Sequence, residues 1–335
     1  KKFVKFNSCK MKVFFHIGYP RTGTTFLQAN IFPFHSQINY LGPKHHFYGD
    51  QPEVNVYLKN DLLKRITNSF KSKNIYELKT SEIVTEMQKI IDINQFDQKK
   101  INLISTEKYL TYGFKSYKEI YLIKKYLSAK VENLDFQIFY LIRNQYDIIF
   151  SQFHHGNFLL KKQLGIDEFE KLIFSLDNIA QAKKEVCEFF ELYDYYKIYN
   201  ELKEIFGEKN IKILEYENFK EDPNDFFSRL SKILKIENSE INNLLNKHKL
   251  NALNQNQNQL IIENSITIFL GNLLKKLNLN KIIPQFLKRK VKILLSTKIL
   301  ITKYDQNKLR SIVKNYYKNS NTNFKNQTGV KFLTT

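Results

Sequence analysis

The sequence predicts an α/β protein with a three-layer fold, in which a central parallel sheet is flanked by helices. Short apolar runs of strand length recur along the chain, and the segments between them place apolar residues at helical spacing. The runs are Val13–Phe15, Ile101–Ile104, Phe136–Ile142 and Ile211–Leu214. Runs that alternate with helices are typical of parallel strands buried on both faces. With 335 residues, 42% of them hydrophobic, the chain is long enough to bury one large core.

The first run leads into a turn rich in glycine and hydroxyl groups, where residues 16–28 read HIGYPRTGTTFLQ. Successive backbone N–H groups at a strand-to-helix turn form an anion-binding concavity. Gly18 and Gly23 let the backbone approach a ligand closely. Arg21 adds a guanidinium that matches phosphate or sulfate oxygens. The turn therefore predicts a P-loop-like anion site, with further hydroxyl donors at Thr22, Thr24 and Thr25.

Two departures from nucleoside-triphosphate binding proteins are informative. A Walker loop places Lys at the position held here by Thr24, and the cation has moved to Arg21. A Walker enzyme also needs an Asp at the end of a strand to help hold Mg²⁺, whereas the run 136–142 ends in Arg143. A basic residue at that place indicates a second phosphate group, so no metal is implied.

At these residues the chain resembles the sulfotransferases that use 3′-phosphoadenylyl sulfate (PAPS). Residues 18–25 match their loop G-x-P-[KR]-[ST]-G-T-T, which binds the 5′-phosphosulfate. Arg143 and Ser151 match their second motif, R-[ND]-P-x-D-x-x-x-S, which holds the 3′-phosphate, although Gln145 replaces its proline. The resemblance implies PAPS as the donor. It also implies a set of binding residues: Gly18, Pro20, Arg21, Thr22, Gly23, Thr24, Thr25, Arg143 and Ser151.

Sulfuryl transfer needs a base close to the donor. In the carbohydrate branch of the family, a Glu just after the strand that corresponds to the run 101–104 is often the general base, commonly within a Glu-Lys pair. Glu107-Lys108 resembles that feature. The alternative is that Glu107 simply opens a helix as a first-turn acid. His16, at the end of the first strand, is a competing base. We expect Arg21 to stabilise charge on the leaving group.

The intervening segments are predicted to be helical. Residues 55–94 and 168–206 have helical spacing, and Gly207 fits a helix C-cap. The run 211–214 is the one late strand expected, followed by a turn at Glu215–Phe219 and by a helix that starts at Asp222-Pro223. This order again resembles PAPS-dependent sulfotransferases, so the resemblance extends over residues 12–236.

The last part of the chain differs in composition. An Asn/Gln-rich stretch at 251–258 predicts a boundary between a catalytic domain, residues 1–250, and a basic helical extension packed on it, residues 251–335. Residues 264–304 carry Lys and Arg but no acidic residue. Such a segment fits either a peripheral contact with an anionic membrane or a helical lid. Tyr316, Ser320 and Asn321 resemble a short C-terminal pattern, Y-x-x-S-N, of bacterial sulfotransferases.

The formal net charge of +20 suits an enzyme whose donor and acceptor are both anionic. Nucleic acid is the rival partner, but no nucleic-acid motif accompanies the charge, so we expect none to bind. Two cysteines and the lack of an apolar run long enough to span a bilayer favour a cytoplasmic location, with the membrane contact at its inner face.

The function predicted is sulfuryl transfer from PAPS to a hydroxyl acceptor, in which Glu107 is the base. The acceptor expected is a sugar of a bacterial surface polysaccharide or glycolipid. A P-loop kinase or NTPase that uses Mg-ATP is one alternative, and a non-enzymatic basic protein that binds nucleic acid or membrane is another.

Overall fold

The computed structural model describes residues 10–19, 21–42, 62–71, 74–106, 117–154, 166–182, 184–247, 259–262, 297–300 and 303–330. A five-stranded sheet forms its centre, in the order β2-β3-β1-β4-β5, and every neighbouring pair is parallel. The strands are β1 (Met11–Gly18), β2 (Ile38–Leu41), β3 (Ile101–Thr106), β4 (Leu134–Ile142) and β5 (Ile211–Glu215). The predicted α/β fold with a parallel sheet is confirmed.

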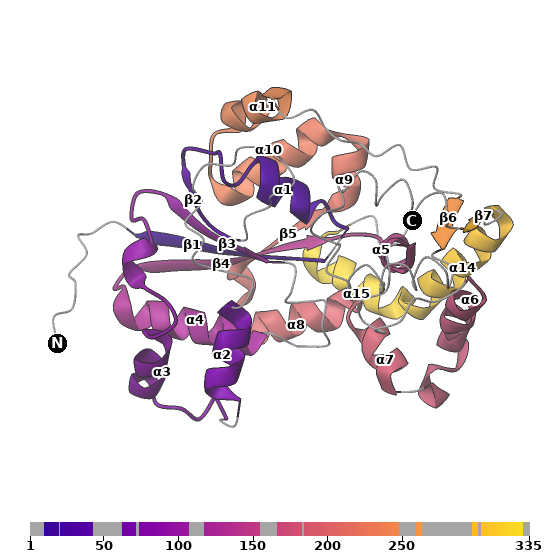
Figure 1. Cartoon of the computed structure of the whole chain (residues 1–335), viewed down its shortest axis with the longest axis horizontal. Coiled ribbons are helices and arrows are strands. Elements are labelled where there is room, and N and C mark those ends of the chain that lie inside the picture. The colour runs from indigo at the N-terminus through magenta and orange to yellow at the C-terminus, as the bar shows by residue number, and fades with distance from the viewer. Residues whose placement is uncertain are drawn as a thin grey trace, which may run out of the picture.

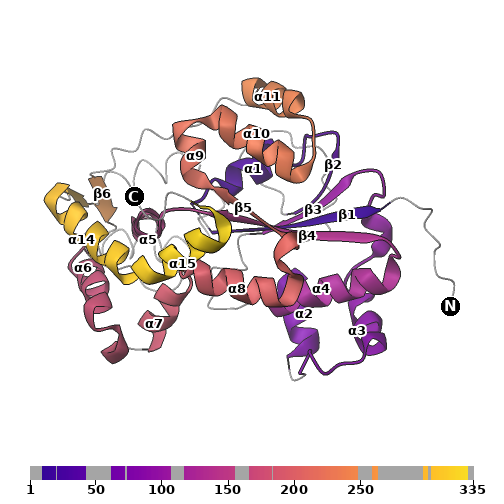
Figure 2. The ribbon, with the colours of Figure 1, turned by 180° about the vertical axis from the view of Figure 1, so that it is seen from behind.

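Helices cover both faces of the sheet (Figures 1 and 2). On the upper face of Figure 1 lie α1 (Thr24–Asn30), α9 (Tyr216–Glu221), α10 (Pro223–Leu234) and α11 (Asn238–Lys247). On the lower face lie α2 (Leu62–Phe70), α3 (Thr80–Met87), α4 (Tyr117–Lys130) and α8 (Tyr195–Phe206). The carboxyl ends of β1 and β4 therefore open between two helical layers, where ligands of open α/β sheets bind.

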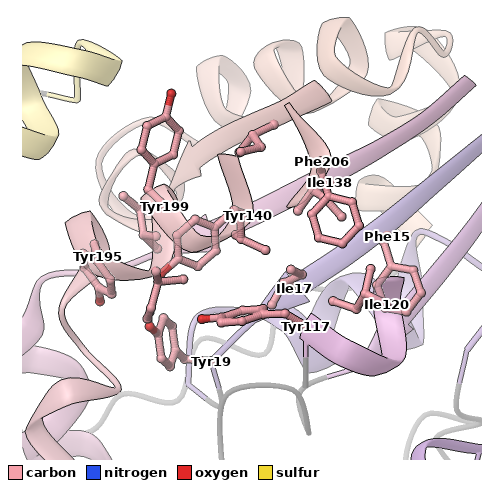
Figure 3. Packing of buried hydrophobic residues seen from close by; sticks show 14 of the residues in the cluster. Phe15, Ile17, Tyr19, Tyr117, Ile120, Ile138, Tyr140, Tyr195, Tyr199 and Phe206 are labelled. Carbon is pink, nitrogen blue, oxygen red and sulfur yellow. The ribbon is translucent and has the colours of Figure 1, made fainter. Parts of the chain in front are cut away.

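The alternation of side chains along β1 builds two separate apolar clusters. Phe15 and Ile17 face the cluster under α4 and α8, whereas Phe14 faces the cluster under α1 and α10. Figure 3 shows residues of the first cluster, in which Tyr117 of α4 lies beside Ile17, and further tyrosines come from the residue after β1, from β4 and from α8. Tyr19 belongs to it and is fully buried, so the first residue of the turn is anchored in the core.

Local signals explain where several helices begin and end. Asp222 caps α10, because its Oδ1 accepts from the Asp225 amide at 3.0 Å, and Pro223 takes the first position, where its missing N–H costs nothing. Asp194 caps α8 in the same way, through the Lys197 amide. Gly207 ends α8 with a φ of 82°, as the sequence predicts.

The remaining helices gather at the carboxyl end of the sheet. They are α5 (Gln145–His154), α6 (Ile166–Phe174), α7 (Lys184–Glu191), α14 (Lys303–Tyr316) and α15 (Lys318–Thr328). Helix α14 packs against α5 and α6, and α15 packs against α8. The C-terminal helices thus lie directly on the part of the fold that follows β4 and precedes β5.

Three expectations about elements were wrong. Strand β2 was not expected, and the predicted turn at Glu215–Phe219 is the end of β5 followed by helix α9. The strand at 211–215 is not the last, because β6 (Gln259–Ile262) and β7 (Thr297–Leu300) pair antiparallel. Most of the basic segment 264–304 lies outside the described residues, so the membrane and lid hypotheses stay predictions.

Candidate functional site

The turn after β1 has an unusual backbone. Arg21 and Gly23 take positive φ angles of 74° and 77°. An L-residue such as Arg rarely adopts this region, because its Cβ crowds the backbone carbonyl. The Thr22 hydroxyl closes the turn: it donates to the Tyr19 carbonyl at 2.6 Å and lies 2.8 Å from Thr24 Oγ1. The hydroxyls of Thr22 and Thr24 are thus engaged inside the turn, and both residues are fully buried.

Glycine is the only residue type that fits at positions 18 and 23 without a shift of neighbouring atoms. A Cβ on Gly18 would lie 2.8 Å from Thr24 Oγ1 and 3.3 Å from His16 Nε2. A Cβ on Gly23 would lie 2.9 Å from Cε2 of Tyr216, and the backbone there is left-handed. Contacts this short require the neighbour to move, so both glycines are needed for the shape of the turn.

The second predicted motif meets the turn in space. Arg143 follows β4, which pairs with β1, and its Nη1 donates to the Arg21 carbonyl at 2.6 Å. Arg21 Nε in turn donates to Ser151 Oγ, on α5, at 3.2 Å. Arg143 Nε is buried and has no hydrogen-bond partner among the residues that the structure describes. Two motifs more than a hundred positions apart therefore form one cluster of basic and hydroxyl groups.

Helix α9 holds both motifs together, a role that the sequence analysis missed. The Arg143 guanidinium lies over the Tyr216 ring, with Cζ 4.9 Å from the ring centroid, and the same ring contacts Gly23. The neighbouring Glu217 accepts from the Asn144 amide through Oε1 at 2.8 Å, and burial raises the pKa of this carboxyl. In the sequence, the pair Tyr216-Glu217 after the strand was the only sign of this role, and it does not indicate which residues the two side chains contact.

The residue that departs from the family motif has its own partner. Gln145, the first residue of α5, exchanges two hydrogen bonds with Asn321 of α15: Gln145 Nε2 donates to Asn321 Oδ1 at 2.7 Å, and Asn321 Nδ2 donates to Gln145 Oε1 at 3.3 Å. Beside it, Ser320 Oγ donates to Asp194 Oδ1 at 2.5 Å. Tyr317, rather than the expected Tyr316, has the Y-x-x-S-N spacing, and its hydroxyl donates to the Phe190 carbonyl at 2.6 Å.

His16 lies beneath the turn and is fully buried. Its Nδ1 is 2.7 Å from Ser105 Oγ, its ring stacks on Phe139, and Nε2 has no hydrogen-bond partner among the described residues. Burial lowers the pKa of His16 to about 3, because a charged imidazolium would lose its hydration there. The side chain is therefore neutral at physiological pH.

Two of the predicted site residues, Pro20 and Glu107, lie outside the described residues, as does Lys108. Strand β3 can be followed to Thr106, which pairs with Ile17, one residue before Gly18. Thr25, also predicted to bind, is half-buried in the first turn of α1. The described chain thus brings the remaining predicted phosphate ligands to one place, at the carboxyl ends of β1 and β4.

Across the parts of the chain that the structure describes, no group of three or more His, Cys, Asp or Glu side chains is arranged to hold a metal ion. Within the same described residues, no helix combines the length and the apolar character needed to cross a membrane.

Comparison with solved structures finds likenesses of low sequence identity. A sulfotransferase from Alicyclobacillus acidocaldarius is 16% identical, with 67% of this chain and 81% of that chain covered and a TM-score of 0.40. A mouse sulfotransferase complexed with PAP is 14% identical, with 70% and 64% covered and a TM-score of 0.36. A retinol dehydratase in complex with retinol and PAP is 13% identical, with 96% and 84% covered and a TM-score of 0.41. No curated protein matches the chain significantly.

A match to a family of known domains covers most of the chain. Residues 12–268 match the family described as the sulfotransferase domain. The matched range contains the turn after β1, the Arg143 motif and helix α9, which the structure joins into one cluster. The chain therefore belongs to the sulfotransferase family.

Proposed function

We propose that the chain transfers a sulfuryl group from PAPS to a sugar hydroxyl, and that the cluster at the ends of β1 and β4 holds the donor. The observation that carries this proposal is the contact between the two predicted phosphate motifs, in which Arg143 reaches the Arg21 carbonyl and Arg21 reaches Ser151. A donor with a phosphosulfate and a second phosphate needs two such anion sites on one surface.

The residues present fit this donor. Arg143 Nε is a buried donor without a partner among the described residues, and a guanidinium carries enough N–H groups to serve the loop and a phosphate together. A Cβ at Gly18 would lie 2.8 Å from Thr24 Oγ1 and one at Gly23 2.9 Å from the Tyr216 ring, so the turn keeps this anion-binding type of backbone only with glycine at both positions. Thr24 stands where a Walker lysine would be, which argues against Mg-ATP.

PAPS supplies the sulfuryl group, and the chain's residues position the reactants and manage charge. We assign Arg143 and Ser151 to the 3′-phosphate, a positioning role. The loop amides and Arg21 stabilise the charge that develops on the leaving phosphate oxygen as the bond from that oxygen to sulfur breaks. The acceptor oxygen forms the new bond to sulfur, and its proton passes to Glu107. The products are a sulfate ester and adenosine 3′,5′-bisphosphate.

Glu107 is preferred over His16 as the base. His16 is fully buried, and its pKa of about 3 leaves it too weakly basic to take a proton from a hydroxyl near neutral pH. Glu107 follows Thr106 in sequence, and the described strand β3 runs beside β1 toward the turn. Its resemblance to the Glu-Lys pair of carbohydrate sulfotransferases supports the same choice, and with it a sugar acceptor. The net charge of +20 suits an acidic glycan.

Calorimetric titration tests the donor site. We expect adenosine 3′,5′-bisphosphate to bind the wild type without metal, and Mg-ATP to bind weakly. Ser151→Ala should weaken the bisphosphate about tenfold, because it removes one hydrogen bond to a charged group. A preference for Mg-ATP would instead assign the loop to a kinase or NTPase.

The acceptor is tested by sulfate transfer from labelled PAPS to a panel of neutral oligosaccharides, acidic oligosaccharides and hydrophobic alcohols. Product on the oligosaccharides, greatest on acidic ones, is the expected result. Transfer to the hydrophobic alcohols alone would reject the sugar acceptor and leave the donor assignment intact.

A further inference from the structure

Arg143 is assigned to the 3′-phosphate by its motif, yet its described contacts point into the other phosphate site. Its Nη1 donates to the backbone carbonyl of Arg21, in the middle of the turn, at 2.6 Å. This distance is short for an N–H···O bond, as is common when the donor carries a charge. The guanidinium therefore fixes the orientation of the peptide group between Arg21 and Thr22.

That peptide group belongs to the least favourable part of the turn. Arg21 has a φ of 74°, which an L-residue adopts only where neighbouring contacts impose it. Several contacts restrain this part of the turn: the Thr22 hydroxyl donates to the Tyr19 carbonyl, Arg21 Nε donates to Ser151 Oγ, and Arg143 donates to the Arg21 carbonyl. Of these three, the Arg143 bond is the one made to the Arg21 peptide group itself, and removal of Arg143 takes it away.

Arg143 is itself held in place from two sides. Its guanidinium lies over the Tyr216 ring at 4.9 Å, and its backbone carbonyl accepts a hydrogen bond from the Tyr195 hydroxyl. Tyr195 is fully buried in the core beside Tyr140 (Figure 3). Arg143 is thus held by α8 at its backbone and by α9 at its guanidinium.

We propose that Arg143 is a positioning residue for the 5′-phosphosulfate loop as well as a ligand of the 3′-phosphate, so that one guanidinium couples the two anion sites. The inference rests on the proposed donor site. It predicts that loss of Arg143 impairs binding of a nucleotide that has no 3′-phosphate at all. An arginine that served the 3′-phosphate alone would have no such effect.

The first test needs no ligand. Amide hydrogen exchange is compared between the wild type and Arg143→Ala over residues 21–25, with labelling times short enough to resolve loop amides. We expect exchange about tenfold faster in the variant, since the restraint on the Arg21 peptide is lost. The matched control is Arg310→Ala. Arg310, on α14, lies over the Tyr146 ring of α5 at 4.7 Å and pairs with Asp147. Its removal takes away a similar stacked arginine whose described contacts are with α5, so exchange in the loop should stay unchanged.

The second test compares two nucleotides in the same variants. Adenosine 5′-phosphosulfate occupies only the 5′ site, and adenosine 3′,5′-bisphosphate occupies both. We expect Arg143→Ala to weaken the 5′-phosphosulfate about tenfold, the amount expected for one charged hydrogen bond, and the bisphosphate by more. Ser151 touches the loop through the Arg21 side chain and not through its backbone. Ser151→Ala should therefore weaken the bisphosphate, leave loop exchange near the wild-type rate, and weaken the 5′-phosphosulfate less than Arg143→Ala does.

The outcomes separate the two proposals. If Arg143→Ala keeps wild-type exchange in the loop and wild-type affinity for the 5′-phosphosulfate but loses the bisphosphate, the coupling is rejected and the donor site stands. If the wild type binds neither nucleotide, the donor site is rejected, and faster loop exchange in Arg143→Ala still decides whether the arginine orders the turn. A thermal midpoint within a few degrees of the wild type shows that the variant is folded.

Discussion

The amide pair between α5 and α15 allows a quantitative test of how the C-terminal helices hold the site. Gln145 and Asn321 are 4% and 3% exposed and exchange two hydrogen bonds, at 2.7 and 3.3 Å. In Asn321→Leu, Gln145 Oε1 loses this bond, and Nε2 keeps a longer one, of 3.4 Å, to the Tyr193 carbonyl. Burying an amide that is unsatisfied in this way costs about 1 to 3 kcal/mol. We therefore expect the free energy of unfolding to fall by about 2 kcal/mol.

A double-mutant cycle separates this cost from ordinary packing changes. Gln145→Met should also cost about 2 kcal/mol, because it leaves the Asn321 amide facing an apolar chain. The double variant places two apolar side chains together, so its cost should be about 1 kcal/mol, well below the sum. Urea unfolding measures all four proteins, and Asn323→Leu, at an exposed position of the same helix, should lie within about 0.5 kcal/mol of the wild type. Additive single costs would refute the reasoning.

Three further changes have defined outcomes. Gly23→Ala should weaken bisphosphate binding at least tenfold and lower the free energy of unfolding more than Gly329→Ala does. Both glycines have a φ near 75°, but only a Cβ at position 23 would meet Tyr216, at 2.9 Å. Equal losses of stability in the two variants would contradict the packing argument. The pKa of His16 is about 3 in the folded chain and 6.5 in the unfolded chain, so between these values the unfolded chain binds one more proton. The free energy of unfolding therefore falls by about 1.4 kcal/mol for each pH unit as the pH drops from 6.5 toward 3. The urea midpoint should fall between pH 7.5 and pH 5.0, and it should fall less in His16→Gln than in the wild type. Glu107→Gln should lower kcat for sulfate transfer by about 10² to 10⁴ with bisphosphate affinity unchanged, and unchanged turnover would return the search for the base to other residues.

The sheet could be predicted because its strands carry their own signal. Strands buried on both faces read as continuous apolar runs, and four of the five strands of the central sheet were found in this way. Strand β2 has only four residues and contains Asn39, so its local pattern is too short to identify it. It exists because it pairs with β3, and pairing is not visible in the segment itself.

Helix α9 shows a second reason for error. It starts directly after β5, and its N-cap Glu215 makes no side-chain capping bond. Without a cap signal, the segment resembles a turn between a strand and the helix that Asp222 begins. The error matters for the site, because α9 supplies Tyr216 and Glu217, which contact the loop and the start of α5. The phosphate ligands could be predicted from spacing, but the side chains that orient them could not.

The departure from the family motif at Gln145 is explained by a contact between residues far apart in the sequence, as in the case of α9. A proline in the first position of a helix fixes the backbone there through its ring. Gln145 has no such ring, but its amide bonds Asn321, 176 residues later, and so ties the start of α5 to α15. The start of α5 matters because Arg143 lies just before it and Ser151 lies on it. In the described part of this chain a tertiary hydrogen bond thus restrains the segment that a proline would restrain locally, and the C-terminal helices become part of what positions the proposed 3′-phosphate ligands.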